Sequence, residues 1–139
     1  MSSIPNTLFV YGTLLQATNG AIHPLLAGQA GFLGAGSIAG KLFLVQDYPG
    51  AVAIADGQSR VFGEVYQLLS PEKLLPALDA YEECAPNFPA PHEYQRLCAP
   101  VLMNTGQSLN AWVYLYNLAT SQLQLISSGD YRSYLSNPL

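Results

Sequence analysis

The sequence predicts one α+β domain that spans residues 1–139 and whose mostly antiparallel strands curl into a small barrel. The chain has 139 residues, 50% of them hydrophobic, which is the usual length of one domain and enough apolar material for one core. Roughly six segments have strand character, largely in hairpin order. Helical segments are few and short, so a doubly wound parallel sheet, which needs crossover helices, is not expected.

The first part of the chain predicts at least two strands and one short helix. Residues 7–11, Thr-Leu-Phe-Val-Tyr, are apolar, β-branched or aromatic, as in a buried strand that ends at Gly12. Residues 19–26 could form a short helix that ends near Gly28. In residues 31–45 glycines recur among apolar residues, which predicts a bent or bulged strand, or two strands.

A hairpin is predicted next. Asp47-Tyr48-Pro49-Gly50 is a turn signal, and residues 51–55 form a short strand candidate. Asp56-Gly57 is a hairpin-turn signal, after which residues 60–68 resume strand character. We therefore expect the segments 51–55 and 60–68 to pair with each other.

One helix is predicted after this hairpin. Ser70 can cap a helix, Pro71 suits its first turn, and an acid at Glu72 is favoured near the positive end of the helix dipole. The helix should run to residue 82 or 83. Pro76 would remove a hydrogen bond inside a continuous helix, so a short first turn followed by a second helix from Pro76 is the alternative.

The remainder of the chain predicts two more strands and a short last segment. Three prolines mark residues 84–92 as a loop. Residues 93–103 and 109–117 are strand candidates joined by a turn. The second carries bulky side chains on both faces, so both faces should be covered. Residues 127–130, Ser-Ser-Gly-Asp, suit a cap or turn before a short helical or irregular end.

Charge and hydropathy argue against two classes of partner. The formal net charge is −4 and the five Lys and Arg residues are scattered, whereas binding to phosphates needs a basic stripe, so no nucleic-acid partner is expected. There is no cationic leader, and no apolar run approaches the roughly 18 residues that a spanning helix requires. We expect a cytoplasmic protein without membrane attachment. The sequence does not predict the oligomeric state.

No metal site or organic cofactor is expected. Cys84 and Cys98 are the only cysteines and fit neither a disulfide framework nor a four-ligand metal site, so reduced structural thiols are favoured. His23 and His92 lack a zinc-binding spacing and should lie in loops or on the surface.

Three further patterns are not specific. The glycines of residues 34–40 fail the dinucleotide-binding fingerprint, because the third comes one residue late and a strand follows where a helix is required. No Gly-x-Ser-x-Gly elbow supports Ser-His-Asp catalysis. Asp79, Glu64 and Glu93 could supply metal ligands or a second carboxylate, but nothing in their spacing indicates this.

The turn Tyr11-Gly12-Thr13-Leu14 is a candidate binding element. A glycine and a small polar residue directly follow a buried strand. Such a turn can point several backbone N–H groups at one place and bind an anion without Arg or Lys. An ordinary strand-ending turn would give the same sequence, so both interpretations stand.

Glu82 is the candidate proton-transferring residue. At roughly 100° per residue, Leu74, Leu78 and Tyr81 share a helical stripe that includes Glu82, while Glu83 points to the opposite side. Burial on an apolar face raises the pKa of a carboxylate and suits it to proton transfer near neutral pH. A rim carboxylate held by a backbone amide or a tyrosine hydroxyl is the alternative.

An ordered set of sequence strings resembles the γ-glutamylcyclotransferase-like family, which includes the γ-glutamylamine cyclotransferases. The set covers nearly the whole chain and is specific as a set, although each string is weak. The strings are LFVYGTL (8–14), DYPGAV (47–52), GEVYQL (63–68), LDAYE (78–82), EYQR (93–96), AWVYLY (111–116) and SSGDY (127–131).

This resemblance implies a closed or nearly closed barrel flanked by short helices, with the first turn and the LDAYE glutamate at one cavity. Family members cyclise a γ-glutamyl group onto its own α-amine, releasing 5-oxoproline and an amine or amino acid without a cofactor. By position, Glu82 would be the general base and then the acid. The turn Tyr11-Gly12-Thr13-Leu14 would bind the glutamyl group of this small-molecule substrate, and Tyr48 and Tyr116 would be pocket-wall residues.

Two features depart from the family pattern. Residues 15–20 are longer and uncharged where many relatives have a basic or small polar residue and a glycine, which concerns the specificity for the leaving group. Glu83 stands where relatives often have a small residue. Because one fold can host several activities, a non-catalytic barrel that binds a small metabolite remains the alternative function.

Overall fold

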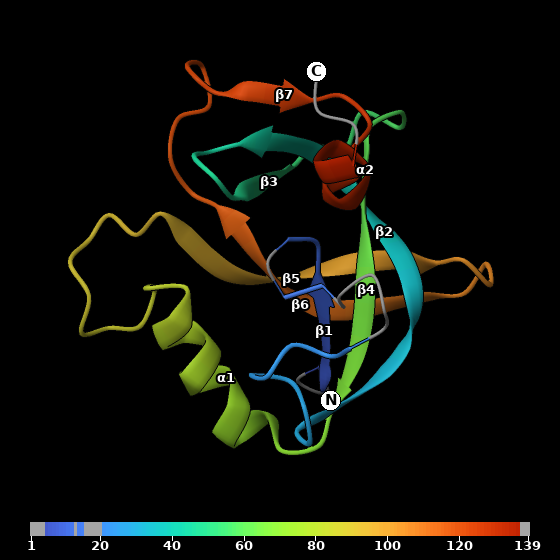
Figure 1. The fold of residues 1–139 in the computed structure, drawn as a ribbon, viewed down its shortest axis with the longest axis vertical. Helices are drawn as coiled ribbons and strands as arrows, with labels where there is room; N and C mark the ends of the chain where they lie inside the picture. The colour runs from blue at the N-terminus through green and yellow to red at the C-terminus, as the bar shows by residue number, and fades with distance from the viewer. Residues whose placement is uncertain (1–4, 13, 16–20, 137–139) are drawn as a thin grey trace.

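The computed structural model describes residues 5–12, 14–15 and 21–136. In that part of the chain it contains seven strands and two helices (Figure 1). They are β1 (Thr7–Val10), β2 (Ala30–Leu44), β3 (Pro49–Ala53), β4 (Arg60–Leu68), α1 (Pro71–Tyr81), β5 (Tyr94–Met103), β6 (Ser108–Tyr116), β7 (Gln124–Ile126) and α2 (Tyr131–Ser136).

Five strands close into a barrel in the order β2-β4-β1-β6-β5. A short antiparallel pairing between β2 and β5, at Gly36–Met103 and Ser37–Leu102, completes the ring. The pairing of β1 with β6 is parallel, and the other ladders of the barrel are antiparallel. The predicted α+β barrel with few, short helices is confirmed.

The long strand β2 belongs to two parts of the sheet. Residues 30–39 pair with β4, with a register shift between Phe32 and Gly34, so the predicted bulged strand is one continuous strand. Residues 40–44 pair with β3, and residues 42–44 also pair with the short strand β7, which the sequence did not predict.

The predicted hairpin between residues 51–55 and 60–68 is wrong. Both β3 and β4 run antiparallel to β2, so they run in the same direction and cannot form a hairpin with each other. The Asp56-Gly57 signal marks a real turn, in which Asp56 accepts hydrogen bonds from the backbone N–H groups of Gln58 and Ser59. β2 is long enough to pair with β3 at one end and with β4 along the rest of its length. The loop that contains Asp56 and Gly57 therefore connects these two partners of β2.

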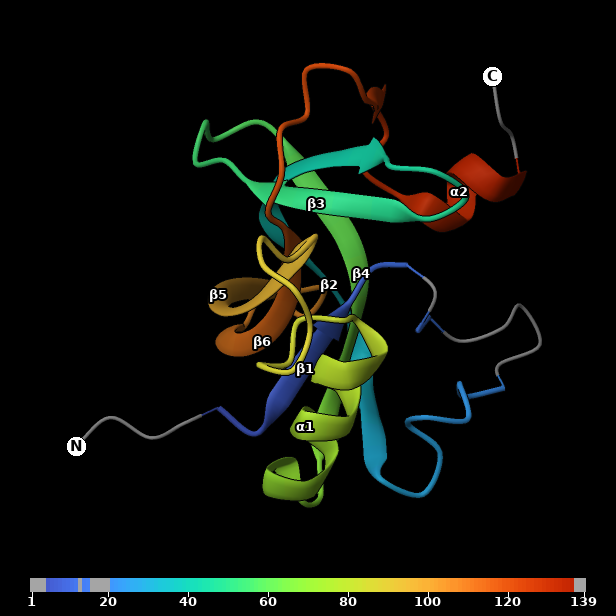
Figure 2. The same ribbon diagram turned by 90° about the vertical axis from the view of Figure 1, so that its left-hand side faces the viewer.

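Helix α1 is continuous from Pro71 to Tyr81 with Pro76 inside it, so the alternative of a second helix beginning at Pro76 is wrong. Pro76 has no N–H to donate to the carbonyl of the residue four positions earlier in the helix. Because Pro76 is exposed, water can bind that carbonyl instead. The buried face of the helix consists of Leu74, Leu75 and Leu78. Figure 2 shows α1 lying beside β1 and β4 on the outside of the barrel.

The helix predicted over residues 19–26 is not found in its described part. Residues 16–20 lie outside the described residues, and residues 24–29 form turns. The N–H groups of Leu26 and Ala27 both donate to the His23 carbonyl. Pro24 cannot donate such a hydrogen bond, which limits the regular pattern here.

Two apolar layers stabilise the fold. Phe9, Ile38, Val65, Val101 and Val113 come from all five barrel strands and form one buried cluster, which therefore fills the barrel interior. Alternate residues of β1 and β6 face outward and pack with the leucines of α1 in a second cluster, so both faces of β6 are covered, as predicted.

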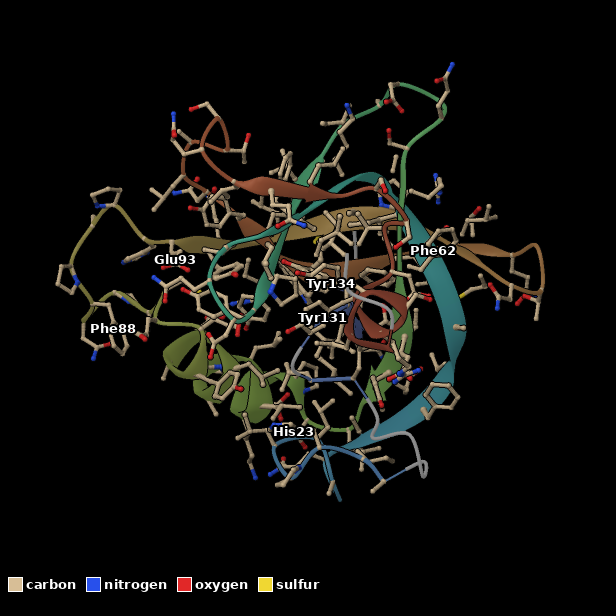
Figure 3. All side chains as sticks on the ribbon, turned by 45° about the horizontal axis from the view of Figure 1, so that its top comes forward. His23, Phe62, Phe88, Glu93, Tyr131 and Tyr134 are labelled. Atoms are coloured by element: carbon tan, nitrogen blue, oxygen red, sulfur yellow. The ribbon has the colours of Figure 1, made fainter. Side chains whose placement is uncertain are left out.

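Helix α2 covers one end of the barrel. Tyr131 is buried in the interior cluster and stacks with Tyr134, with ring centroids 6.3 Å apart (Figure 3). In the described part of the chain, neither helix has the length and apolar character needed to cross a membrane.

Candidate active site

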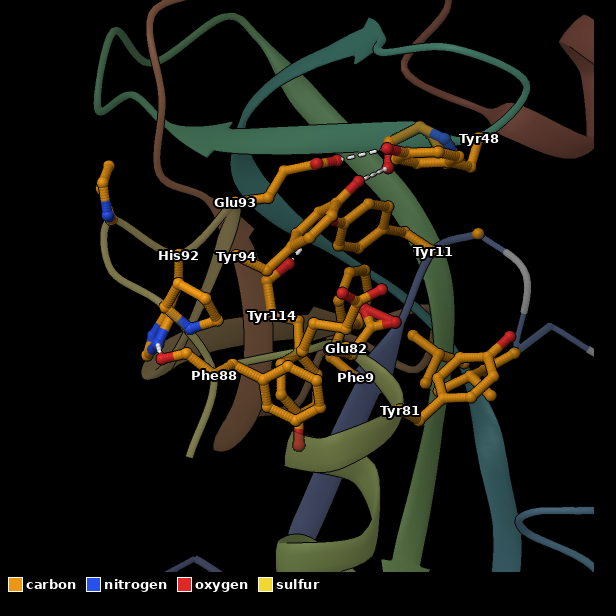
Figure 4. Close-up of a pocket in the computed structure, with 17 residues that line it drawn as sticks. Phe9, Tyr11, Tyr48, Tyr81, Glu82, Phe88, His92, Glu93, Tyr94 and Tyr114 are labelled. Carbon is orange, nitrogen blue, oxygen red and sulfur yellow. Dashed lines mark hydrogen bonds between the residues drawn. The ribbon is translucent and has the colours of Figure 1, made fainter. Parts of the chain in front are cut away.

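A cavity of about 560 Å³ lies where the end of β1, the C-terminal end of α1, the start of β3 and the loop before β5 meet (Figure 4). Its lining includes Tyr11, Gly12 and Leu14 from the first turn and Glu82 from the end of α1. The structure therefore brings together two elements that are about 70 residues apart in the sequence, as the resemblance implied. Thr13 lies outside the described residues.

Glu82 is placed by the end of α1. It follows Leu78 by one helical turn, and its own N–H donates to the Leu78 carbonyl at 2.9 Å, so the buried face of the helix continues into its side chain. Glu82 is partly buried, whereas Glu83 is exposed. Tyr81 differs from the prediction, because its side chain is 43% exposed and meets the ring of His23 edge-on.

The chain reverses sharply just after helix α1, at Glu83, which has a φ of 57°. A left-handed residue at this position is a common way to end a helix, and glycine adopts it most readily. Glu82, between Tyr81 and this reversal, is the C-terminal cap residue of the helix and lines the cavity.

The environment of Glu82 favours its protonated form. Burial and, second, the negative charge of Glu93 raise the pKa of Glu82 from 4.5 to about 7. Within the described residues no hydrogen bond to its carboxylate opposes this shift. A carboxyl group that titrates near neutral pH can both accept and donate a proton at that pH.

The end of β1 approaches the start of β3 very closely. A Cβ atom added to Gly12 would lie 2.7 Å from Cγ of Pro49, so a larger residue would force the two segments apart. The N–H of Leu15 donates to the Gly12 carbonyl at 3.0 Å, which closes the turn. A glycine is therefore required for the shape of this wall.

Two tyrosine hydroxyls are used to hold the cavity together. The Tyr11 hydroxyl donates to the Tyr114 carbonyl at 2.5 Å and accepts from the Ala51 N–H at 3.1 Å. The Tyr94 hydroxyl donates to the Pro49 carbonyl at 2.6 Å. Burial raises the pKa of both tyrosines, so both stay protonated at neutral pH. Their aromatic rings remain available to line the cavity.

Of the two wall residues that the resemblance implied, one lies in the wall. Tyr48 lines the cavity, and its hydroxyl donates to Oε1 of Glu93 at 2.5 Å. Tyr116 is not part of the lining, and its ring packs edge-on against that of the lining residue Tyr94 with centroids 5.8 Å apart.

The sequence did not assign several lining residues to the site. Tyr94 lies opposite Tyr116 in the β5–β6 ladder, so a correct strand pairing would have indicated it. Phe88, His92 and Glu93 come from a proline-rich loop and its junction with β5, where no periodic pattern indicates a direction for a side chain. The sequence named Glu93 only as a carboxylate without a specific role.

Behind the cavity, an ionic network joins α1 to the barrel. Asp79 accepts hydrogen bonds from Arg96 Nε at 2.7 Å and from the Tyr114 hydroxyl at 2.6 Å. The Arg96 guanidinium lies 4.5 Å from the ring centre of Trp112. Asp79 thus supports the last turn of α1. In the part of the chain that the structure describes, no three His, Cys, Asp or Glu side chains are placed to hold a metal ion.

Residues 8–133 match the family described as γ-glutamyl cyclotransferase, AIG2-like. The chain belongs to this family. The match includes both the end of β1 and Glu82, and the closed barrel is the fold of an AIG2-like protein from Mus musculus, which is 25% identical with a TM-score of 0.64 over 84% of this chain and 80% of the mouse chain.

Other relatives agree with this assignment. A Methanocaldococcus jannaschii protein, provisionally named a γ-glutamylcyclotransferase, is 28% identical over 91% of this chain and 96% of its own length. Bacillus subtilis YkqA is 26% identical, with a TM-score of 0.68 over 96% of this chain. The present chain spans 43% of the length of YkqA. Together, the family match and the archaeal relative support a cyclotransferase-type enzyme.

Proposed function

We propose that this γ-glutamyl cyclotransferase-like protein converts a γ-glutamyl amide into 5-oxoproline and a free amine, with Glu82 as general base and then acid. The observation that carries the proposal is one partly buried carboxyl group, with a pKa of about 7, that lines the same cavity as the turn after β1. Proton transfer is most effective when the pKa of the transferring group is near the working pH.

In the proposed reaction, Glu82 removes a proton from the α-ammonium group of the substrate. The free amine then attacks the γ-carbonyl carbon, a C–N bond forms in the ring, and the C–N bond to the leaving amine breaks. The ring nitrogen gives up two protons in all, and the released amine gains two when it leaves as an ammonium ion. Glu82 carries protons between these nitrogens, and no water is consumed.

The walls of the cavity have a positioning role in this proposal. The nucleophile and the carbonyl belong to one molecule, so the protein mainly has to hold a folded conformer, and such orientation can supply about 7–11 kcal/mol in well-aligned systems. Main-chain N–H groups of the turn at residues 11–14 would bind the glutamyl group and stabilise the developing oxyanion. The close approach of Gly12 to Pro49 supports a fixed shape for this turn.

The proposal is tested by measuring 5-oxoproline release from a panel of γ-glutamyl amides with wild-type protein and with Glu82→Gln. The variant keeps the shape of the side chain but cannot transfer the proton, so we expect kcat to fall by about 10²–10⁴-fold. Glu72→Gln, at an exposed acid in the first turn of α1, is the matched control and should retain activity. Far-UV circular dichroism and Tm would show that all three proteins are folded.

Undiminished turnover by Glu82→Gln would refute the role of Glu82. If 5-oxoproline raises the Tm of the wild-type protein while no γ-glutamyl amide is turned over, a non-catalytic metabolite-binding barrel would be favoured instead.

A further inference from the structure

A second cavity, of about 260 Å³, lies between β2, the start of β4 and the segment that follows β7. Its lining is formed by residues 40–42, 58–60, 62 and 125–129, and it shares no residue with the lining of the candidate active site. In Figure 3 Phe62 of the second cavity lies on the opposite side of the molecule from Phe88 and Glu93 of the candidate active site. The two cavities are therefore separate.

The second cavity has the opposite charge from the first. The charged side chains that line the candidate active site are Glu82, Glu83 and Glu93, with no Lys or Arg among its described lining residues. The second cavity is lined by Lys41 and Arg60, and its described lining includes no Asp or Glu. A ligand that enters the second cavity meets positive charge, which favours an anion.

Lys41 and Arg60 form no ion pair with a carboxylate of the described residues, although both are partly buried. The chain has five Lys and Arg residues. Of the other three, Arg96 and Arg132 are paired with acids, and Lys73 is exposed on α1. Removing a charge from water is costly unless the charge is paired. A bound anion would supply the missing partner for both cations at once.

The nearby acids already have other hydrogen-bond donors. Asp56 is close enough to Lys41 for their charges to interact, but its carboxylate accepts hydrogen bonds from the N–H groups of Gln58 and Ser59. The carboxylate of Asp130 caps the first turn of α2 by accepting hydrogen bonds from two of its N–H groups. Neither acid lines the second cavity, so the positive charge there is not cancelled from within.

Arg60 is held in a fixed orientation. Its Nε donates to Oγ of Ser37 at 3.0 Å, and its Nη2 donates to the Ser37 carbonyl at 2.8 Å. Ser37 is itself buried. A guanidinium group has five N–H donors, so three of them remain without a hydrogen bond to any described residue. A planar set of N–H donors matches the oxygens of a carboxylate or a phosphate.

The remaining walls add a further donor and an apolar surface. The Phe62 N–H donates to the Gly129 carbonyl at 2.8 Å, which holds residues 127–129 against β4. Ser127 lines the cavity, and its hydroxyl, which makes no hydrogen bond to a described residue, can donate to an anion. The side chains of Phe62 and Leu125 are 43% and 45% exposed beside these polar groups. The cavity therefore combines cationic and apolar walls.

We propose that the second cavity binds a small organic anion. Its carboxylate or phosphate group lies between Lys41 and Arg60, and its apolar part contacts Phe62 and Leu125. The volume of about 260 Å³ is below that of sites for drug-sized ligands, so the ligand is a small one. The inference does not depend on the proposed function, because it uses no residue of the candidate active site.

The test is a titration of the ¹⁵N-labelled 139-residue protein with phenyl phosphate and with benzoate, followed by NMR. Ionic strength is held constant, because salt screens charge interactions. We expect saturable shifts of the Lys41, Phe62 and Gly129 amide signals, while the signals of Gly12 and Glu82 stay in place. Benzyl alcohol, which has no charge, should cause no such shifts. The lower Kd of the two anions identifies the preferred acidic group.

Variants separate the two kinds of wall. Lys41→Gln should raise the Kd of phenyl phosphate about tenfold, because a hydrogen bond between charged groups is lost. Arg60→Lys keeps the charge but loses the planar donors, so it should also weaken binding. Lys73→Gln removes the same charge from α1 and is the matched control, with an unchanged Kd. Phe62→Ala should weaken the binding of phenyl phosphate but not that of inorganic phosphate.

Three results would overturn the inference. The first is the absence of saturable shifts with both anions in the wild type. The second is the same Kd in Lys41→Gln as in Lys73→Gln, provided that the Tm values show both variants to be folded. The third is a set of shifts centred on Gly12 and Glu82, which would place the anion in the candidate active site instead. Equal binding of benzyl alcohol and benzoate would likewise overturn it, because the charge would then contribute nothing.

Discussion

The carboxyl group of Glu82 owes its high pKa to two neighbours of different kinds. Removal from water is the larger cause, and the charge of Glu93 is the second. Both raise the pKa, and within the described residues nothing donates a hydrogen bond that would lower it. The protonation of Glu82 therefore changes in the range in which many enzymes work, and the activity should follow it.

We expect kcat/KM for 5-oxoproline release to rise with pH through a midpoint near pH 7, because Glu82 must be ionised to act as a base. In Glu93→Gln the like charge is absent, so the pKa of Glu82 falls and the midpoint moves to lower pH. Steady-state rates between about pH 5 and pH 9 measure both midpoints. A midpoint in Glu93→Gln that is unchanged or higher would contradict this electrostatic coupling.

At the scale of single residues, helical periodicity was a good guide to Glu82 and a poor one to Tyr81. The spacing from Leu74 and Leu78 placed Glu82 on the buried face, and in the structure Glu82 is partly buried at the end of that face. The same spacing placed Tyr81 there as well, but the helix ends at that residue and its ring turns toward His23. Glu93 could not be oriented in advance, because the loop before it has no periodicity.

At the scale of elements, α1 is held in place by more than its leucines. Asp79 is bound by Arg96 and Tyr114, and Tyr114 also accepts the Tyr11 hydroxyl hydrogen bond through its carbonyl. One residue of β6 thus contacts both the helix that carries Glu82 and the end of β1. The relative position of the two halves of the cavity depends on this connection.

Asp79→Asn should lower the free energy of unfolding by about 1–3 kcal/mol, because it leaves the Arg96 guanidinium without its charged partner. Tyr114→Phe removes a single hydrogen bond and should cost about 1 kcal/mol. Urea denaturation of both variants measures these losses. If Asp79→Asn is as stable as the wild type, the network does not hold α1.

Elements with a clear alternation were predicted best. β4 has the bounds that the sequence indicated, residues 60–68. The strands on either side of the turn at residues 104–107, β5 and β6, begin and end within one residue of the predicted bounds. The hairpin failed for a topological reason, since local turn residues do not specify which long strand a segment will join. β7 has three residues, too few for any pattern to be visible.

At the scale of the whole molecule, the barrel can close only where backbones approach each other closely. A Cβ atom added to Gly63 of β4 would lie 2.1 Å from the carbonyl oxygen of Val10 at the end of β1. Val10 directly precedes the turn that lines the cavity. The pairing of β1 with β4 and the shape of the candidate site therefore depend on the same contact.

Gly63→Ala should destabilise the protein by about 3 kcal/mol, because an extra methyl group cannot be accommodated without moving a barrel strand. Gly31→Ala in β2 is the matched control, since an added Cβ there would meet no atom within 4 Å, and its effect should stay within about 0.5 kcal/mol. Thermal unfolding followed by circular dichroism compares the two. Equal Tm values for these variants would show that β1 and β4 can separate without cost.

Strand patterns predicted a barrel, and the family resemblance added that it is closed or nearly closed and that two distant segments meet at one cavity. The resemblance could not predict the cavity wall formed by residues 83–93, because that segment is an irregular loop that belongs to no helix or strand. Thr13, which the resemblance assigned to the substrate, lies outside the described residues.

The loop between α1 and β5 supplies Phe88, Pro89, Pro91 and His92 to the cavity but forms no part of the barrel ladders. Changes in the length of a surface loop cost little free energy. If the proposed function holds, changes in this segment would alter the range of amines that the cavity accepts without changing Glu82 or the turn after β1. Exchanging the loop between homologues would be a direct route to enzymes with new selectivity.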